Sequence, residues 1–265
     1  MMNRILTAYV AFISALMILP IAIVIAASIN SAAYLSFPPA GFSTIWYKEV
    51  LTDPTWSGSL WLTLKIGMAV SMLSTVLGVA AALGLRAVSD TWSAVLQTFF
   101  LSPLMLPTVL IGLSLMQLYQ SLGIRASVLT VTLGQLLIAC PYVIRLVLAS
   151  FNGIDPRLER AASILGANPI RVFWHVTFPL IRHGVLAGFL FSFIVSLDDV
   201  NIALFLSDVH TTPLPVQLFS YIEQNADSLG AAAASLLVLL ACGAVFICDR
   251  LVGIEWLFGA KQRSG

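Results

Sequence analysis

Two adjacent carboxylates, Asp198 and Asp199, are the residues of this sequence best suited to chemistry. They lie in an apolar segment that begins near Gly184, and the α-helical rise per residue places them roughly 21 Å along a helix. If that helix crosses a membrane, each ionised carboxylate costs about 2.5–3.5 kcal/mol, so the pair must face protein or water. The carboxylates could attract a cationic solute by charge and hydrogen bonding, or they could form a structural network with another helix, for example through Arg145 or a helix of a companion chain.

The two carboxylates cannot share one direction, because neighbouring side chains on a helix point about 100° apart. Asp199 continues a stripe of small polar residues, Ser192 and Ser196, which could pack closely on another helix or line an aqueous path. Asp198 lies on a more apolar face, with Asn201 one turn onward. We therefore expect Asp199 to face a path more directly and Asp198 to lie nearer a helix contact.

The composition indicates the environment in which these carboxylates lie. Of the 265 residues, 59% are hydrophobic and only 9% are charged, whereas a soluble domain carries about 25% charged residues. This contrast excludes a soluble enzyme, a nucleic-acid binder and a disordered chain, and the net charge of +1 implies no polyanionic partner. Cys140, Cys242 and Cys248 lie in apolar runs without a CxxC pair, so we expect no disulfide framework and no metal site.

Six segments are long and apolar enough to cross a bilayer, which takes about 20 residues each. They cover roughly residues 5–29, 60–85, 94–120, 128–150, 184–206 and 230–252. We therefore predict an all-α polytopic membrane protein with six transmembrane helices in one domain, 1–265. The first segment is longer than the apolar part of a signal peptide and is expected to be retained. Pro20, Pro103, Pro107 and Pro141 interrupt the segments and should kink them.

The distribution of basic residues predicts the orientation. With a cytoplasmic N-terminus, ten of the 13 Lys and Arg residues lie inside, two lie outside and Lys65 lies within a span. The inside residues are Arg4, Arg86, Arg145, Arg157, Arg160, Arg171, Arg182, Arg250, Lys261 and Arg263, and the outside ones are Lys48 and Arg125. Because the opposite orientation reverses this bias, both termini are predicted to be cytoplasmic.

The cytoplasmic loop 151–183 has more structure than a linker requires. The pairs Asp155-Pro156 and Asn168-Pro169 each supply a helix N-cap followed by Pro at the first helical position. Gly166 suits the end of the first of these short helices. Such a loop could be a stiff protrusion that docks on a cytoplasmic partner, or an amphipathic segment that lies flat on the lipid headgroups.

The same loop resembles a known signature. The stretch Glu159-Arg-Ala-Ala-Ser-Ile-Leu-Gly166-Ala, continuing to Val176-Thr-Phe178-Pro179, is similar to the EAA-x3-G-x9-I-x-L-P signature of ABC importer permeases. Arg160 replaces the signature Glu, Val176 replaces Ile and Phe178 replaces Leu. The resemblance assigns a coupling role to Glu159, Arg160, Ala161, Ala162, Gly166, Ala167 and Pro179. The second short helix is expected to end before Pro179.

The resemblance implies a type I ABC importer permease fold over nearly the whole chain, in the inner membrane of a bacterium. The loop would form the coupling helix, which sits in a groove of a cytoplasmic ABC ATPase dimer. This chain has no G-x-x-x-x-G-K-[ST] motif, so ATP and Mg would be used by that separate subunit. The chain itself would do no covalent chemistry and bind no cofactor. One six-span chain is half of the usual pathway, so a second permease is expected, in a homodimer or a heterodimer.

Three further stretches resemble the polyamine (spermidine/putrescine) permease branch. They are Ser196-Leu-Asp198-Asp199-Val with Ala203-Leu-Phe205-Leu-Ser, Leu214-Pro215-Val-Gln-Leu-Phe-Ser-Tyr221, and Phe42-Ser-Thr-Ile-Trp46-Tyr47. The resemblance implies an amine-bearing solute, which an extracytoplasmic binding protein delivers to Trp46, Tyr47 and the loop 207–227. Trp46 could equally be an interfacial anchor. The outer Asp208, Glu223 and Asp227 would add a negative field that favours cations, or they are solvated loop charges.

The predicted solute pathway comprises Ser196, Asp198, Asp199, Asn201 and Thr108. Thr108 stands where several polyamine permeases carry an acidic residue, so opines, other amino compounds and aminophosphonates are alternative solutes. An ion-coupled secondary transporter would favour inverted repeats and broken helices at matched positions in the two halves, and no matching charge pattern is obvious here. A membrane assembly factor without transport would explain the two aspartates poorly.

Overall fold

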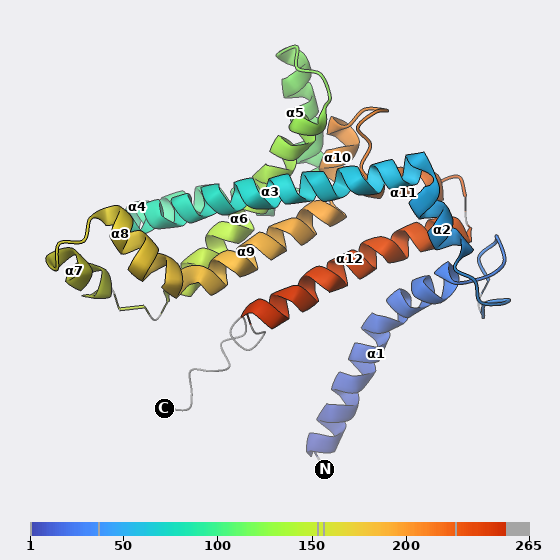
Figure 1. The fold of residues 1–265 in the computed structure, drawn as a ribbon, viewed down its shortest axis with the longest axis horizontal. Coiled ribbons are helices and arrows are strands. Elements are labelled where there is room, and N and C mark those ends of the chain that lie inside the picture. Colours follow the sequence, from blue (N-terminus) through green and yellow to red (C-terminus); the bar gives the residue numbers. More distant parts are fainter. Residues whose placement is uncertain (1, 37, 153, 156, 226, 253–265) are drawn as a thin grey trace. The chain divides into compact units, whose positions relative to one another are not determined.

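The computed structural model describes residues 2–36, 38–152, 154–155, 157–225 and 227–252, and these residues are almost entirely helical (Figure 1). Lys261, Arg263 and Pro156 lie outside the described residues, as do the side chains of Arg4 and Cys248. The helices are α1 (Met2–Ser28), α2 (Ile45–Thr52), α3 (Pro54–Ala87), α4 (Asp90–Leu101), η1 (Ser102–Met105), α5 (Thr108–Ser121), α6 (Val128–Phe151), α7 (Arg157–Ile164), α8 (Pro169–Val172), the π-helix η2 (Phe173–Thr177), α9 (Phe178–Asp198), α10 (Asn201–Leu206), α11 (Leu214–Ile222) and α12 (Ser228–Val252).

Five helical segments are long and apolar enough to cross a membrane. They are Leu6–Ser28, Pro54–Ala87, Val128–Phe151, Pro169–Asp198 and Ser228–Ile247. A sixth candidate is the pair Asp90–Met105 and Thr108–Ser121, whose two halves bend by 97° at a short break. The six-helix fold class predicted from the sequence is confirmed when this bent pair counts as one span.

The bend falls where two prolines interrupt the predicted span 94–120. Pro103 lies in the first turn of η1, and Pro107 is the N-cap residue of α5. Because proline has no backbone N–H to donate to a preceding turn, the helix stops and restarts in a new direction. Pro20 and Pro141, in contrast, lie inside the continuous helices α1 and α6.

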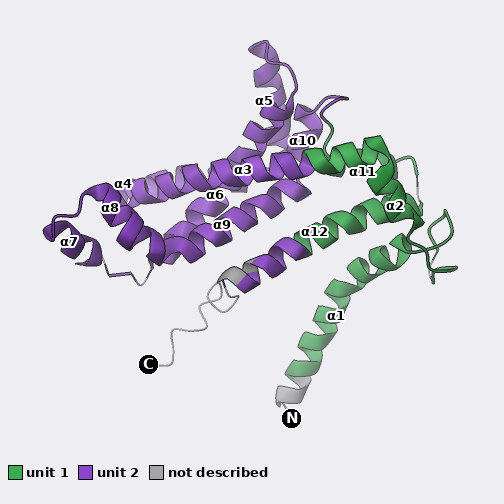
Figure 2. Ribbon diagram, in the orientation of Figure 1, with its two compact units in different colours: residues 1–62, 212–242 green, residues 63–211, 243–265 purple. Residues whose placement is uncertain are grey.

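The chain forms two compact units, which we describe separately (Figure 2). Unit 1 comprises 1–62 and 212–242, and its core is apolar. The buried core side chains are Val50, Trp56, Leu214, Leu229, Ala232 and Ala233. Within this unit the Tyr47 hydroxyl lies 2.6 Å from Ser28 Oγ and 2.7 Å from Ser235 Oγ, so it ties α2 to both α1 and α12.

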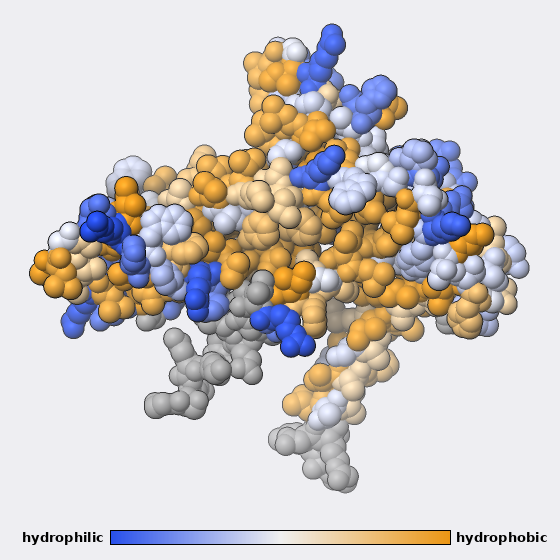
Figure 3. Space-filling view, viewed as in Figure 1, coloured by the Kyte–Doolittle hydropathy of each residue, from blue (hydrophilic) through white to orange (hydrophobic). Residues whose placement is uncertain are grey.

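Unit 2 comprises 63–211 and 243–265, and its centre is the antiparallel pair α6 and α9. Gly184 near the start of α9 lies against Ser150 near the end of α6, and a Cβ atom on Gly184 would meet the Ser150 Cβ at 2.6 Å. Glycine is therefore required for the close approach of the two helices. Hydrophilic side chains gather at the α7–α8 end of this unit, and apolar side chains cover most of the visible face over its part of α3 (Figure 3).

Candidate functional site

Two groups of polar side chains in unit 2 lie at opposite ends of α9, and the first surrounds the break between α9 and α10. Asp199 is 8% exposed. Its Oδ2 accepts hydrogen bonds from Gln135 Nε2 at 3.0 Å and from the backbone N–H of Ala203 at 3.2 Å. Its Oδ1 accepts from the Ile202 N–H at 3.3 Å. The carboxylate thus fastens the first turn of α10 to α6.

Gln135 is the functional-site residue that the sequence analysis missed. Its side chain is 1% exposed, and its Oε1 accepts a hydrogen bond of 2.5 Å from Ser196 Oγ. Ser196, Gln135 and Asp199 therefore form one buried chain of hydrogen bonds. Gln135 is the one amide side chain of the segment 128–150, and this was the available signal, because a buried polar group needs partners.

The two neighbouring aspartates take opposite environments, and it is Asp199, not Asp198 as predicted, that contacts another helix. Asp198 is exposed and Asp199 is buried. The reason is that α9 ends at Asp198, and Asp199 has an extended backbone (φ −73°, ψ 109°). Because Asp199 lies outside the helix, the angle of about 100° between neighbouring helical side chains does not apply to this pair. The Asp199 carboxylate instead points toward α6. Whether either carboxylate meets solute stays a prediction.

The partner suggested for a structural network also differs. Arg145 is exposed, and the partners of Asp199 are a neutral amide and backbone N–H groups. Asn201 Nδ2 donates to Thr108 Oγ1 at 2.8 Å, which joins α10 to the first residue of α5. The structure thus brings together all five predicted pathway residues of unit 2 around the α9–α10 break.

Trp46 and Tyr47 belong to unit 1, and their polar atoms have internal partners. Trp46 Nε1 donates to the Asn30 carbonyl oxygen at 2.8 Å, and the Tyr47 hydroxyl is held between two serines. Both side chains are half-buried. These contacts give each residue a structural role, and delivery of solute to them stays a prediction.

The outer acidic residues are also partly engaged. In unit 1 the Tyr221 hydroxyl donates to Asp227 Oδ2 at 2.5 Å, and burial together with this carboxylate raises the pKa of Tyr221 to about 12. In unit 2 a hydrogen bond from the Thr211 hydroxyl lowers the pKa of the half-buried Asp208. Tyr221 is therefore a neutral donor at physiological pH, and Asp208 is ionised.

The second polar group lies at the other end of α9, and it includes α7, where the signature of loop 151–183 begins. The N–H of Ala167 bonds to the Ala162 carbonyl at 3.1 Å, and the N–H of Gly166 bonds to the Ser163 carbonyl at 3.0 Å. With Gly166 at φ +86°, this is the Schellman ending of a helix. The glycine and the flanking alanines of the signature thus end α7 and let α8 follow closely.

The second short helix starts as predicted but does not end before Pro179. Asn168 caps α8 by accepting from the Arg171 N–H at 2.8 Å, with Pro169 next. The chain then passes through the π-helix η2 directly into α9, and Pro179 lies in the first turn of α9. A missing N–H is tolerated in a first turn, so the helix continues, and the helical stretch that is long and apolar enough to cross a membrane is Pro169–Asp198.

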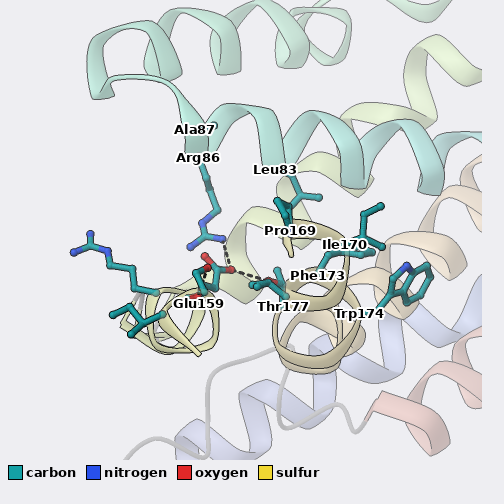
Figure 4. Close-up of a pocket in the computed structure, with 13 residues that line it drawn as sticks. Leu83, Arg86, Ala87, Glu159, Pro169, Ile170, Phe173, Trp174 and Thr177 are labelled. Carbon is teal, nitrogen blue, oxygen red and sulfur yellow. Dashed lines mark hydrogen bonds and ion pairs between the residues drawn. The ribbon is translucent and has the colours of Figure 1, made fainter. Parts of the chain in front are cut away.

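Glu159 points into unit 2. Its Oε1 accepts from Arg86 Nη1 at 3.2 Å and from Thr177 Oγ1 at 2.8 Å (Figure 4). The Arg86 guanidinium also lies over the Phe151 ring, 3.9 Å from its centroid, which is a favourable cation–π geometry. Arg160, at the position of the signature glutamate, is exposed.

A groove of about 1050 Å³ lies beside this contact, between the end of α3, α7 and the α8–η2 segment. Large apolar side chains of the loop are also open to solvent, with Ile164 85%, Leu165 87% and Ile170 70% exposed. An exposed apolar surface of this kind marks a site of association. Within the described ranges, no group of three or more His, Cys, Asp or Glu side chains is suited to a metal ion.

Comparison with known proteins identifies the family. The profile of the binding-protein-dependent transport system inner membrane component matches residues 74–253, which include both polar groups. This chain belongs to that family. The putrescine transport system permease protein PotI of Escherichia coli K12 is 32% identical over 231 residues, covering 84% of this chain and 81% of PotI. The spermidine/putrescine permease protein PotC of Haemophilus influenzae is 27% identical over 241 residues, covering 91% and 93%.

The fold has a counterpart among solved structures. A bacterial alginate ABC transporter, crystallised with a periplasmic protein bound to an alginate pentasaccharide, superposes with a TM-score of 0.71 at 12% identity. The match covers 94% of this chain and 93% of that one. The chain therefore has the type I importer permease fold predicted from the loop signature, and it is a transport permease of the inner membrane, not an enzyme.

Proposed function

We propose that this permease carries polyamines, such as putrescine or spermidine, or a closely related amine-bearing solute. Two relatives are named for the transport of these compounds. The observation that carries the proposal is Asp198, an exposed carboxylate at the end of a helix long enough to cross a bilayer. Among the described residues it has no ion-pair partner. Its charge is therefore free to attract an ammonium group by a charge-assisted hydrogen bond.

In this proposal the solute passes the α9–α10 break. Asp198 provides the negative charge, and the side chains of Asn201 and Thr108 lie on the neighbouring elements α10 and α5. Asp199 acts indirectly, because its hydrogen bonds to Gln135 and α10 hold the break in place. A second permease, identical or different, completes the path, and an extracytoplasmic binding protein delivers the solute.

The α7–α8 loop is proposed to dock on a cytoplasmic ATPase dimer, which binds the ATP and Mg. The exposed apolar side chains of this loop favour a role in docking on a protein, because a solvated linker would carry polar side chains there. The bias of basic residues supports a cytoplasmic location for this loop and for both termini.

The experiment is reconstitution of this chain with its ATPase, its second permease and its binding protein in proteoliposomes. We expect uptake of labelled putrescine that requires ATP and is stimulated by the binding protein. Uptake at the full rate by this chain alone, without nucleotide, would instead identify an ion-coupled or passive transporter. ATP-driven uptake of another solute, with no competition by putrescine or spermidine, would refute the polyamine assignment.

A further inference from the structure

Three side chains connect the coupling loop to the membrane helices of unit 2. Arg86 comes from the last turn of α3, Glu159 from the first turn of α7 and Thr177 from the last residue of η2. A single oxygen, Glu159 Oε1, accepts from both of the others, at 3.2 Å and 2.8 Å. We call this contact the Arg86–Glu159–Thr177 clamp (Figure 4).

The clamp bridges a part of the loop that is otherwise weakly attached. In α7, no residue is buried, and Gly166 in the turn that follows this helix has open space around it. Arg86, in contrast, is held by the Phe151 ring, and Phe151 belongs to the buried core of α3, α6 and α9. The clamp therefore connects an exposed short helix to the rigid part of unit 2.

Thr177 gives the clamp a direct connection to the solute end. It is the residue immediately before α9, and α9 runs without interruption from Phe178 to Asp198. A helix of 21 residues is about 30 Å long. A displacement at Thr177 is therefore transmitted along one rigid element to the carboxylate at its far end.

The clamp is also placed where it can open and close. The Arg86 and Glu159 side chains are 26% and 27% exposed, and the groove beside them admits solvent. A partly solvated ion pair is worth little net free energy. It can therefore fix the relative positions of α7 and α9 in one state without preventing a change to another.

We propose that the Arg86–Glu159–Thr177 clamp makes α7 move together with α3 and α9, so that the stroke of the ATPase on the loop reaches Asp198. This inference rests on the proposed docking of the loop on an ATPase. Arg86 and Thr177 are positioning residues in this scheme, since they act through Glu159. Glu159 works inside the permease, and the charge that α7 presents to the ATPase at this point is that of Arg160.

The test uses the complete reconstituted importer and measures two quantities, putrescine transported per ATP hydrolysed and co-purification of the ATPase. Arg86→Gln and Glu159→Gln are each expected to lower the transport ratio about two- to five-fold while the ATPase still co-purifies. The double variant Arg86→Glu/Glu159→Arg restores an ion pair of reversed polarity but loses the cation–π contact with Phe151, so it is expected to recover part of the ratio. Thr177→Val, which keeps the side-chain shape, should give a smaller loss.

Arg182→Gln is the matched control, because Arg182 is an exposed arginine on α9 with no ion pair in the described part of the chain. Its transport ratio should equal that of the wild type. An unchanged ratio in Arg86→Gln, or a charge-reversed double variant no better than the single ones, would overturn the clamp. So would loss of ATPase co-purification in Glu159→Gln alone, since Glu159 would then contact the ATPase itself.

Different experimental results would refute the clamp and the proposed function. A wild-type importer without ATP-dependent putrescine uptake would refute the proposed function, whatever the variants do. A wild-type importer that works, with clamp variants that keep its transport ratio, would refute the clamp alone. If Arg86→Gln does not assemble, recovery of assembly and transport ratio in the double variant supports the clamp, and failure of both counts against it.

Discussion

The junctions at the two ends of α9 are both held by an acidic side chain, but the partners and the burial of the two side chains differ. At each end an acidic side chain joins neighbouring elements: Asp199 joins the first turn of α10 to α6, and Glu159 joins α7 to α3 and η2. Asp199 is buried and bonds to a neutral amide and to backbone N–H groups. Glu159 is partly exposed and pairs with a cation, Arg86.

This difference shows which junction is fixed and which can move. A buried carboxylate that loses a partner has no water to replace it, so its hydrogen bonds are costly to break. A partly solvated ion pair exchanges its partner for water with little change in free energy. We therefore regard the Asp199 junction as a permanent joint and the Glu159 junction as a reversible one, which suits a protein driven from the Glu159 side.

The largest effect is expected from removing the partner of the buried carboxylate. Gln135→Leu leaves Asp199 without its side-chain donor, which should cost about 1–3 kcal/mol of stability. Thermal unfolding of the purified chain in detergent should shift to lower temperature by several degrees. Gln117→Leu, which changes an exposed amide on α5, is the control and should unfold near the wild-type temperature. Equal shifts in the two variants would mean that the network is not a joint.

The two aspartates can be separated by the same conservative change. Asp198→Asn removes the exposed charge and should raise the KM for putrescine uptake about tenfold, with the unfolding temperature unchanged, because a charge-assisted hydrogen bond is lost. Asp199→Asn should lower the unfolding temperature and reduce uptake through the amount of folded importer. If Asp199→Asn instead raises the KM at full stability, the buried residue contacts solute and our assignment of roles is reversed.

The reversible junction depends on a loop of defined shape. Gly166 has a positive φ that an alanine adopts at a cost of about 1–2 kcal/mol. Gly166→Ala should therefore loosen the end of α7 and lower the putrescine transported per ATP hydrolysed. Gly84→Ala, in the helical part of α3 and equally open to an added Cβ, is the matched control and should have no such effect. Equal coupling in both variants would show that the Schellman turn is dispensable.

The smallest expected effect is that of salt on the unfolding temperatures of variants at the two junctions. Because mobile ions screen a partly solvated pair, the small difference in unfolding temperature between wild type and Glu159→Gln should shrink from low salt to about 1 M NaCl. The difference between wild type and Gln135→Leu should persist, since its hydrogen bonds are buried. A salt-insensitive Glu159 difference would place that residue in the same class as Asp199.

The sequence predicted those features that depend on local chemistry. Asn168-Pro169 as a helix start and Gly166 as a helix stop need only neighbouring residues, and both are as predicted. The prolines at 103 and 107 indicated a kink, but its 97° angle depends on how α5 packs. The orientation of Asp199 depends on where α9 ends and on Gln135, 64 residues away. The Arg86–Glu159 pair joins residues 73 apart, and no local pattern indicates it.

The pairing of Asp199 with Gln135 also bears on how the protein is made. The amide precedes the carboxylate in the chain, so α6 has already left the ribosome when the end of α9 reaches the translocon. The Gln135 amide is therefore already available as a hydrogen-bond donor when Asp199 enters the lipid. This hydrogen bond offsets part of the insertion cost of about 2.5–3.5 kcal/mol for a lone charge. Nascent chains that carry Gln135→Leu are accordingly expected to insert α9 less efficiently, and glycosylation mapping of the segment after α10 would measure that loss.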